Sequence, residues 1–173
     1  MGFWALEEDS NGQDQQASRA ARGWGMALRG EGGMILLTSE LRAALRANDI
    51  ARRAAQQSAQ REPDPVPVVK LFSPVGAATW LATELDADGD TLFGLADLGF
   101  GCPELGSFSL AEIASLRLPF GLAIERDLHF STAHSLSAWA DAARRAGSII
   151  GAEHDLRRKM ATGGGNELPS KGG

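Results

Sequence analysis

The sequence predicts an α+β fold, with a single small domain whose short, mostly antiparallel sheet is packed by three to four helices and flanked by disordered tails. Two segments, 38–55 and 136–146, place apolar residues at helical spacing. Between them lie short runs of β-branched or alternating residues, which are typical of strands. The chain of 173 residues is 43% hydrophobic, which is enough for one modest core.

Composition divides the chain into three segments. Residues 1–33 are polar and glycine-rich without sustained periodicity, which predicts a disordered N-terminal extension. The codons of residues 30–34 can spell a ribosome-binding sequence before an ATG, so one hypothesis is that this start is mis-assigned and Met34 is native. The alternative is an ordinary flexible extension. We expect residues 34–146 to form the globular domain, and 147–173 to form a helical extension ending in a disordered glycine-rich tail.

The first half of the domain contains residues that are typical of helix starts, linkers and strands. Thr38 or Ser39 can cap a helix that extends to about residue 55, with its arginines mostly on solvated positions, and a polar linker follows over 56–65. The β-branched run 66–72 predicts a strand. Ser73 followed by Pro74 is typical of an N-cap and first helical residue, which predicts a helix over 77–85.

The second half is expected to contain more strands. The predicted elements are a turn over 86–90, a strand over 91–98, a glycine-rich break over 99–103, a short strand over 107–109, a helix over 110–116 opened by a capping box, an alternating strand over 124–130 and a helix over 136–146. Trp80 and Trp139 are predicted to be core residues rather than a base-stacking platform.

Acidic residues gather in the middle of the chain. The formal net charge is −5, yet residues 71–116 contain seven carboxylates and no Lys, Arg or His. They are Glu84, Asp86, Asp88, Asp90, Asp97, Glu104 and Glu112. Such an acidic field can bind cations, meet a basic protein surface or keep a small domain soluble. The acidic balance also makes direct nucleic-acid binding unexpected, because phosphates are neutralised by Lys and Arg.

Part of the acidic block has the spacing of a calcium loop. Asp86, Asp88, Asp90 and Asp97 fall at positions 1, 3, 5 and 12 of such a loop. Thr91 occupies the sixth position, where the sharp turn needs glycine, and position twelve is not Glu. A solvated turn between two elements is therefore the favoured interpretation. No cofactor is expected, with a divalent metal as the alternative.

A second set of polar residues lies on the alternating strand. Glu125, Asp127 and His129 would share one face, where they could coordinate a divalent metal or act as general acid and base. The favoured alternative is the outward polar face of an edge strand. Arg126 would fall on the apolar face, which predicts an ion pair with Glu84, Asp97 or Glu104, and these four residues form a candidate binding set.

A succession of short motifs resembles a known bacterial family. The motifs are 67–72, 79–81 with Glu84, 93–95, 97–99, 103–106, 108–110, 121–122 and 124–130. In this order they resemble the family catalogued as domain of unknown function 2958, over residues 34–146. The resemblance implies a setting on plasmids, conjugative elements and phages, where a similar domain occurs beside antirestriction and transfer-associated domains. It implies no catalytic mechanism.

Two functions follow as hypotheses. The favoured one is a noncatalytic accessory protein of a mobile element that binds or modulates a protein with a basic surface, in transfer, regulation or anti-defence. The alternative is a small metal-dependent enzyme that uses Glu125, Asp127 and His129. The sequence contains one cysteine and no apolar run long enough for a membrane span, so we expect a cytoplasmic protein without a membrane partner.

Overall fold

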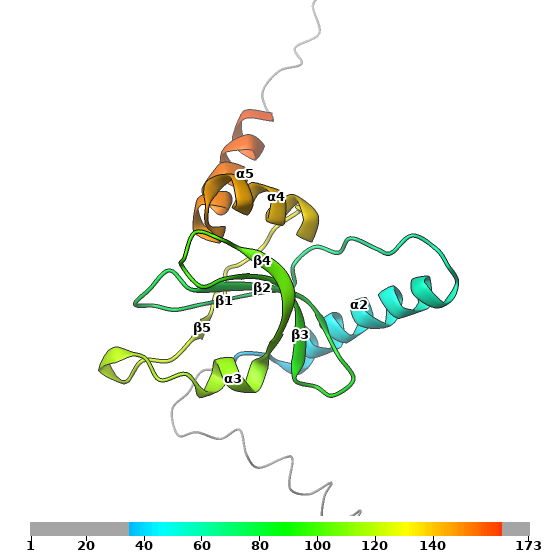
Figure 1. Cartoon of the computed structure of the whole chain (residues 1–173), viewed down its shortest axis with the longest axis horizontal. Helices are drawn as coiled ribbons and strands as arrows, with labels where there is room; N and C mark the ends of the chain where they lie inside the picture. Colours follow the sequence, from blue (N-terminus) through cyan, green and yellow to red (C-terminus); the bar gives the residue numbers. More distant parts are fainter. Residues whose placement is uncertain (1–34, 164–173) are drawn as a thin grey trace, which may run out of the picture. The chain divides into compact units, whose positions relative to one another are not determined.

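The computed structural model describes residues 35–163 and contains a five-stranded antiparallel sheet with strand order β4-β3-β2-β1-β5 (Figure 1). The elements are α2 (Ser39–Gln57), β1 (Val69–Phe72), β2 (Thr79–Leu85), β3 (Thr91–Asp97), β4 (Glu104–Ser109), α3 (Leu110–Ser115), the short 3₁₀ helix η1 (Pro119–Gly121), β5 (Glu125–Arg126), α4 (Leu136–Ala146) and α5 (Ile149–Gly163). This architecture confirms the predicted α+β class. The predicted N-terminal extension and the glycine-rich end from residue 164 lie outside the described residues.

Each face of the sheet has its own hydrophobic core. On one face, side chains of β1, β2 and β3 pack with residues of α2 and α3; Leu45, Leu71 and Leu92 are fully buried there. On the other face, Leu81 and Leu95 pack with α4 and α5, including Trp139. Trp80 and Trp139 are both buried, as predicted for core residues. Among the described residues no helix has the length and apolarity needed to cross a membrane.

The helices α2, α3 and α4 begin where the sequence predicts. The hydroxyl of Thr38 accepts a bond from the amide of Leu41 (3.4 Å), and the Ser109 hydroxyl accepts one from the amide of Glu112 (3.1 Å). Helix α4 ends at a left-handed Gly147 (φ 69°), a conformation that glycine adopts without strain. These caps are local, which is why the sequence identifies them.

The helix predicted over 77–85 is wrong, because this segment is strand β2. Ser73 and Pro74 begin a turn instead of a helix. The amide of Gly76 donates to the carbonyl of Ser73 (3.5 Å), and the amide of Ser73 donates to the carbonyl of Ala78 (2.9 Å). Proline is as suitable at the second position of a turn as at the first position of a helix. All seven residues of β2 are buried, so the strand lacks the alternation that would identify it.

The strand predicted over 124–130 is also largely wrong. Only Glu125 and Arg126 form β5, which pairs with β1. After them the chain turns. The carboxylate of Asp127 accepts a hydrogen bond from the amide of His129 (3.0 Å), and the carbonyl of Asp127 accepts one from the amide of Phe130 (3.4 Å). The turn ends the alternation and leaves Leu128 62% exposed rather than in the core.

Strand β2 carries a bulge at Thr83. The pairing with β3 shifts between Ala82 and Glu84, so two residues of β2 oppose one of β3. Beside the bulge, an ideal Cβ on Gly94 would lie 1.8 Å from the carbonyl oxygen of Leu81. Glycine is therefore required at this position because the two backbones approach closely.

We predict that Gly94→Ala destabilises the protein by about 3 kcal/mol or more, because the added methyl group has no space and the backbone of β2 must move. The matched control is Gly106→Ala. Gly106 pairs with Gly94 from β4, and a methyl group added there would meet no atom within 4 Å. Urea unfolding of both variants measures the difference; equal stability of the two would show that the close approach at Gly94 does not constrain the sheet.

Candidate functional site

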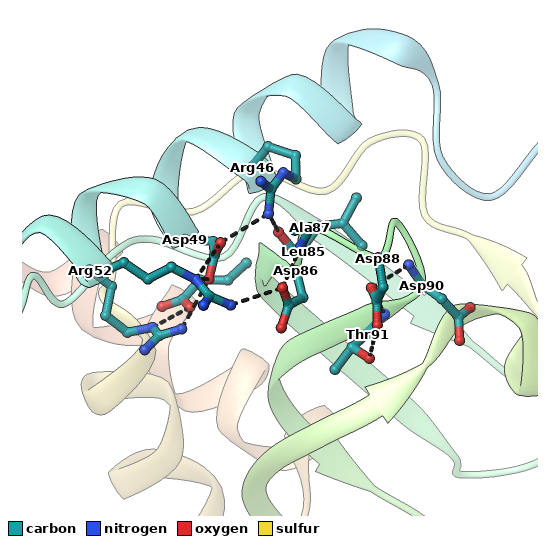
Figure 2. Close-up of polar contacts among 11 residues, drawn as sticks. Arg46, Asp49, Arg52, Leu85, Asp86, Ala87, Asp88, Asp90 and Thr91 are labelled. Atoms are coloured by element: carbon teal, nitrogen blue, oxygen red, sulfur yellow. Dashed lines mark hydrogen bonds and ion pairs between the residues drawn. The ribbon is translucent and has the colours of Figure 1, made fainter. Parts of the chain in front are cut away.

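The carboxylate of Asp49 lies at the centre of an ion-pair cluster between α2 and the sheet (Figure 2). Its side chain is only 3% exposed. Three arginines of the same helix surround it: Arg46 Nη1 at 2.9 Å, Arg52 Nη2 at 3.0 Å and Arg53 Nε at 2.9 Å. A carboxylate that accepts several bonds from guanidinium groups is held in one orientation.

The same arginines reach β2 and the turn after it. Arg52 Nε lies 2.6 Å from Glu84 Oε2, and Arg53 Nη2 lies 2.8 Å from Asp86 Oδ1. Arg46 Nη1 donates to the carbonyl of Leu85 (2.9 Å). None of these arginines is buried, in agreement with the prediction of mostly solvated positions, but their ion pairs were not predicted from the sequence. Three arginines and three carboxylates balance the charge of the cluster.

The bonds inside the cluster keep its arginines charged. The hydrogen bond to Glu84 raises the pKa of Arg52 above its ordinary value, with burial acting in the opposite direction. The hydrogen bond to Asp49 raises the pKa of Arg53. Both shifts reinforce the protonated state that arginine already has at neutral pH, so the cluster keeps these positive charges.

Two further side chains attach α2 to the sheet. Asn48 donates to the carbonyl of Thr83 (2.8 Å), which is the bulged residue of β2. Arg42 donates to the carbonyl of Gly89 (3.0 Å) in the turn before β3. The helix thus donates hydrogen bonds to backbone carbonyls of the bulge and of the turn.

A cleft of about 490 Å³ opens beside this cluster. Its walls come from α2, the 62–65 segment, β2, β3, β4 and the start of α4. Its acidic lining consists of Asp49, Glu62, Asp64, Glu84 and Asp86. Arg52 is the basic residue among the lining side chains, and Phe93, Leu105 and Leu136 contribute apolar surface. We call this feature the acidic cleft.

Asp64 joins the acidic cleft to α4. Its carboxylate accepts the amide of Ser137 (3.1 Å) and the hydroxyl of the same residue. It therefore caps the helix, since the N-cap residue Ser135 makes no side-chain cap bond. Burial disfavours the ionised carboxylate, but the bonds from Ser137 and Ser135 and the attraction of Arg61 outweigh it, so the pKa of Asp64 is lowered from 3.8.

The seven carboxylates of residues 71–116 do not form one continuous acidic surface. Glu84 and Asp97 are buried, and Asp86 pairs with Arg53. Asp97 is fully buried and accepts the amides of Gly99 (2.8 Å) and Ile149 (2.9 Å), so it caps the first turn of α5. Much of the predicted acidic field thus stabilises the fold from within.

The carboxylates with calcium-loop spacing have other partners. Asp88 accepts the amides of Asp90 (2.8 Å) and Thr91 (2.9 Å), which closes the turn between β2 and β3. Asp90 accepts the Ser109 hydroxyl (2.7 Å) and the amide of Ala111 (2.7 Å), at the start of α3. Within residues 35–163 no group of three or more His, Cys, Asp or Glu side chains is arranged to hold a metal ion.

Glu125, Asp127 and His129 line one shallow surface hollow, but they do not lie on one strand. Asp127 Oδ2 lies 3.3 Å from Lys70 Nζ, and Lys70 also pairs with Glu153 at 2.6 Å. His129 lies in the turn after β5 and is exposed. The turn after β5 thus removes the shared strand face that the sequence predicts.

The residues of the predicted Arg126 set also lie apart. Arg126 Nη1 donates to the carbonyl of Leu36 (3.4 Å), while Glu84 pairs with Arg52. Glu104 belongs to β4, at the opposite edge of the sheet from β5. Glu84 is the member of this set that lines the acidic cleft.

Sequence reasoning missed Asp49, Glu62 and Asp64. A signal for Asp49 exists: it follows Leu41 and Leu45 at intervals of four, so it occupies the apolar stripe of the helix. It also has arginines at the −3, +3 and +4 positions. A carboxylate on an apolar stripe among arginines predicts a buried ion-pair cluster. Glu62 and Asp64 carry no comparable signal, because their role depends on the fold.

The family described as protein of unknown function (DUF2958) matches residues 36–150. The chain belongs to this family. The match extends from α2 to the beginning of α5 and includes every residue that lines the acidic cleft. Comparisons with curated proteins and with solved structures gave no match.

We predict that Asp64→Asn makes stability less dependent on pH. The folded-state pKa of Asp64 is lowered, so its contribution is complete above the unfolded-state pKa near 3.8 and disappears as the pH falls through the folded value. The difference in melting temperature between wild type and variant should therefore be nearly constant at higher pH and shrink as the pH falls below about 3.8. Ser137→Ala removes the hydroxyl donor and should weaken the same pH dependence. A difference that stays constant below this pH would contradict the assigned cap.

Proposed function

We propose that this protein is a noncatalytic binding module that recognises a basic surface of a partner protein through the acidic cleft. The observation that carries the proposal is one cleft lined by five carboxylates: Glu62 and Asp64 lie outside the arginine cluster, and Asp49, Glu84 and Asp86 belong to it and are balanced by its three arginines. A Lys or Arg side chain of a partner would enter next to Phe93 and Leu105, which can contact its methylene stem.

Two carboxylates that line the cleft are held in position by other residues of the domain. Glu84 is fixed by Arg52, and Asp64 is fixed by the start of α4. Glu62 is exposed and accepts a bond from Gln56 (3.0 Å), so its charge is available at the rim. Carboxylates already held in place lose little conformational entropy on binding, which favours affinity.

Exposed rim charges mainly affect the association rate and its dependence on salt. A basic partner would be attracted over about a Debye length, near 8 Å at physiological ionic strength. Binding should therefore weaken as salt is added.

The family resemblance suggests the setting. We infer a cytoplasmic accessory role on a mobile genetic element, in transfer, regulation or anti-defence. Proteins that contact DNA present basic surfaces, so a host defence nuclease, a transfer protein or a DNA-binding regulator has the required chemistry.

The metal-dependent alternative has less support. Asp127 pairs with Lys70, which it shares with Glu153, and accepts the amide of His129, so its carboxylate oxygens already have partners. Glu125 and His129 come from different local conformations, a strand and a turn. The binding module is therefore the better-supported function.

A direct test titrates the ¹⁵N-labelled full chain with a nine-residue arginine-rich peptide and, separately, with its glutamate-for-arginine analogue. We expect shifts of amide signals around Glu62, Glu84 and Asp86 with the basic peptide alone. The variant Glu62→Gln should weaken binding about threefold, which corresponds to a partly exposed ion pair.

The matched control is Glu112→Gln, which removes an exposed carboxylate of α3 outside the acidic cleft and should leave the affinity unchanged. Shifts that do not cluster at the cleft, or equal losses in the two variants, would show that the peptide responds only to net charge. That outcome would contradict the proposed function.

A further inference from the structure

Strand β4 is an edge of the sheet. It pairs with β3 from Glu104 to Ser109, and the strand order places no strand on its other side among the described residues. In an antiparallel strand every second residue points its N–H and C=O groups away from the paired neighbour. The outer side of β4 therefore offers a row of main-chain donors and acceptors to another strand.

Apart from the charge of Glu104 at its first residue, the edge lacks the features that usually block strand addition. Its register with β3 is continuous over six pairs, without a bulge. It contains no Lys and no Pro, and Gly106 lies at its centre. Leu105 is 40% exposed on this strand. Natural edge strands that must remain unpaired generally carry charges, proline or bulges.

One face of β4 leads into the acidic cleft. Leu105 and Ser107 line the cleft together with Thr91 and Phe93 of β3. These side chains share a face, since Phe93 pairs with Ser107. A strand added outside β4 would lie about 4.8 Å away, and its side chains on this face would stand beside Leu105 and Ser107. Glu62 and Asp64, which lie outside the arginine cluster, line the same cleft as Leu105 and Ser107. Long basic side chains at these positions of the added strand would therefore enter the cleft toward these two carboxylates.

Two independent features thus indicate the same occupant. The open edge selects an extended main chain, and the carboxylates of the cleft select Lys or Arg at alternate positions. A second copy of this chain is disfavoured by charge, because the formal net charge is −5 and Glu104 lies at the edge itself.

We infer that an extended, basic segment of the partner binds as an additional antiparallel or parallel strand along β4 and inserts alternate Lys or Arg side chains into the acidic cleft. This inference rests on the proposed function and specifies how the partner is held. Main-chain bonds would supply affinity, and the cleft would supply the preference for basic residues.

The test uses the full chain and two synthetic nine-residue peptides that alternate Val and Arg. One has an ordinary backbone, and the other has N-methyl groups on alternate amides so that it cannot complete a ladder. We expect the first peptide to bind at least tenfold more tightly than the second. We also expect it to slow hydrogen exchange at alternate amides between Glu104 and Ser109.

A pair of variants tests the position. Ser107→Lys places a cation at the mouth of the cleft, on an exposed residue, and should reduce binding at least tenfold. Ser131→Lys adds the same charge at an exposed residue outside the cleft and should leave affinity within about twofold. Circular dichroism of both variants confirms that the fold is retained.

The outcomes separate the two proposals. Equal binding of both peptides, with shifts at the cleft, would overturn strand addition but leave recognition of basic groups intact. Binding of neither peptide would overturn both. Concentration-dependent dimerisation in analytical ultracentrifugation that is lost in Ser107→Lys would assign the edge to a second copy of the chain and overturn the inference.

Discussion

The ion pairs of the buried Asp49 carboxylate fix the positions of α2, the β2 bulge and the acidic cleft. Three guanidinium groups converge on the carboxylate, and each of them also reaches β2 or the turn after it. Without this carboxylate, three positive charges would lie close together at the interface between helix and sheet. The Asp49 carboxylate therefore holds together the polar contacts between helix and sheet, while Leu45 belongs to the hydrophobic core at the same interface.

Many carboxylates of this acidic chain have structural roles in the fold. Asp97 caps α5, Asp64 caps α4, and Asp88 closes a turn. Glu84 completes the arginine cluster. Carboxylates thus add to the two hydrophobic cores by satisfying backbone amides and cations. Those that line the cleft remain oriented toward a space that a basic group can enter, which links the stability of the fold to its proposed function.

The accuracy of sequence-based prediction depends on whether the deciding contacts are local. Helix α4 is predicted within its observed limits, Leu136–Ala146, because its stripe and its terminal glycine are adjacent in sequence. Strand β2 is mistaken for a helix, since burial on both faces removes its alternation. Of the five carboxylates that line the acidic cleft, the sequence predicts only Glu84 and Asp86 as candidate site residues. Asp49, Glu62 and Asp64 acquire their roles from segments distant in the chain.

The central claim is tested most directly by urea unfolding of Asp49→Ala beside Asp141→Ala. Asp141 forms the same i,i+3 pair with an arginine, but its side chain is 65% exposed. Removing the buried carboxylate should cost about 2–3 kcal/mol, because three partly exposed arginines lose their shared partner and keep only Glu84 and Asp86, whereas removing the exposed one should cost less than about 1 kcal/mol. Losses of the same size in the two variants would contradict the role assigned to Asp49.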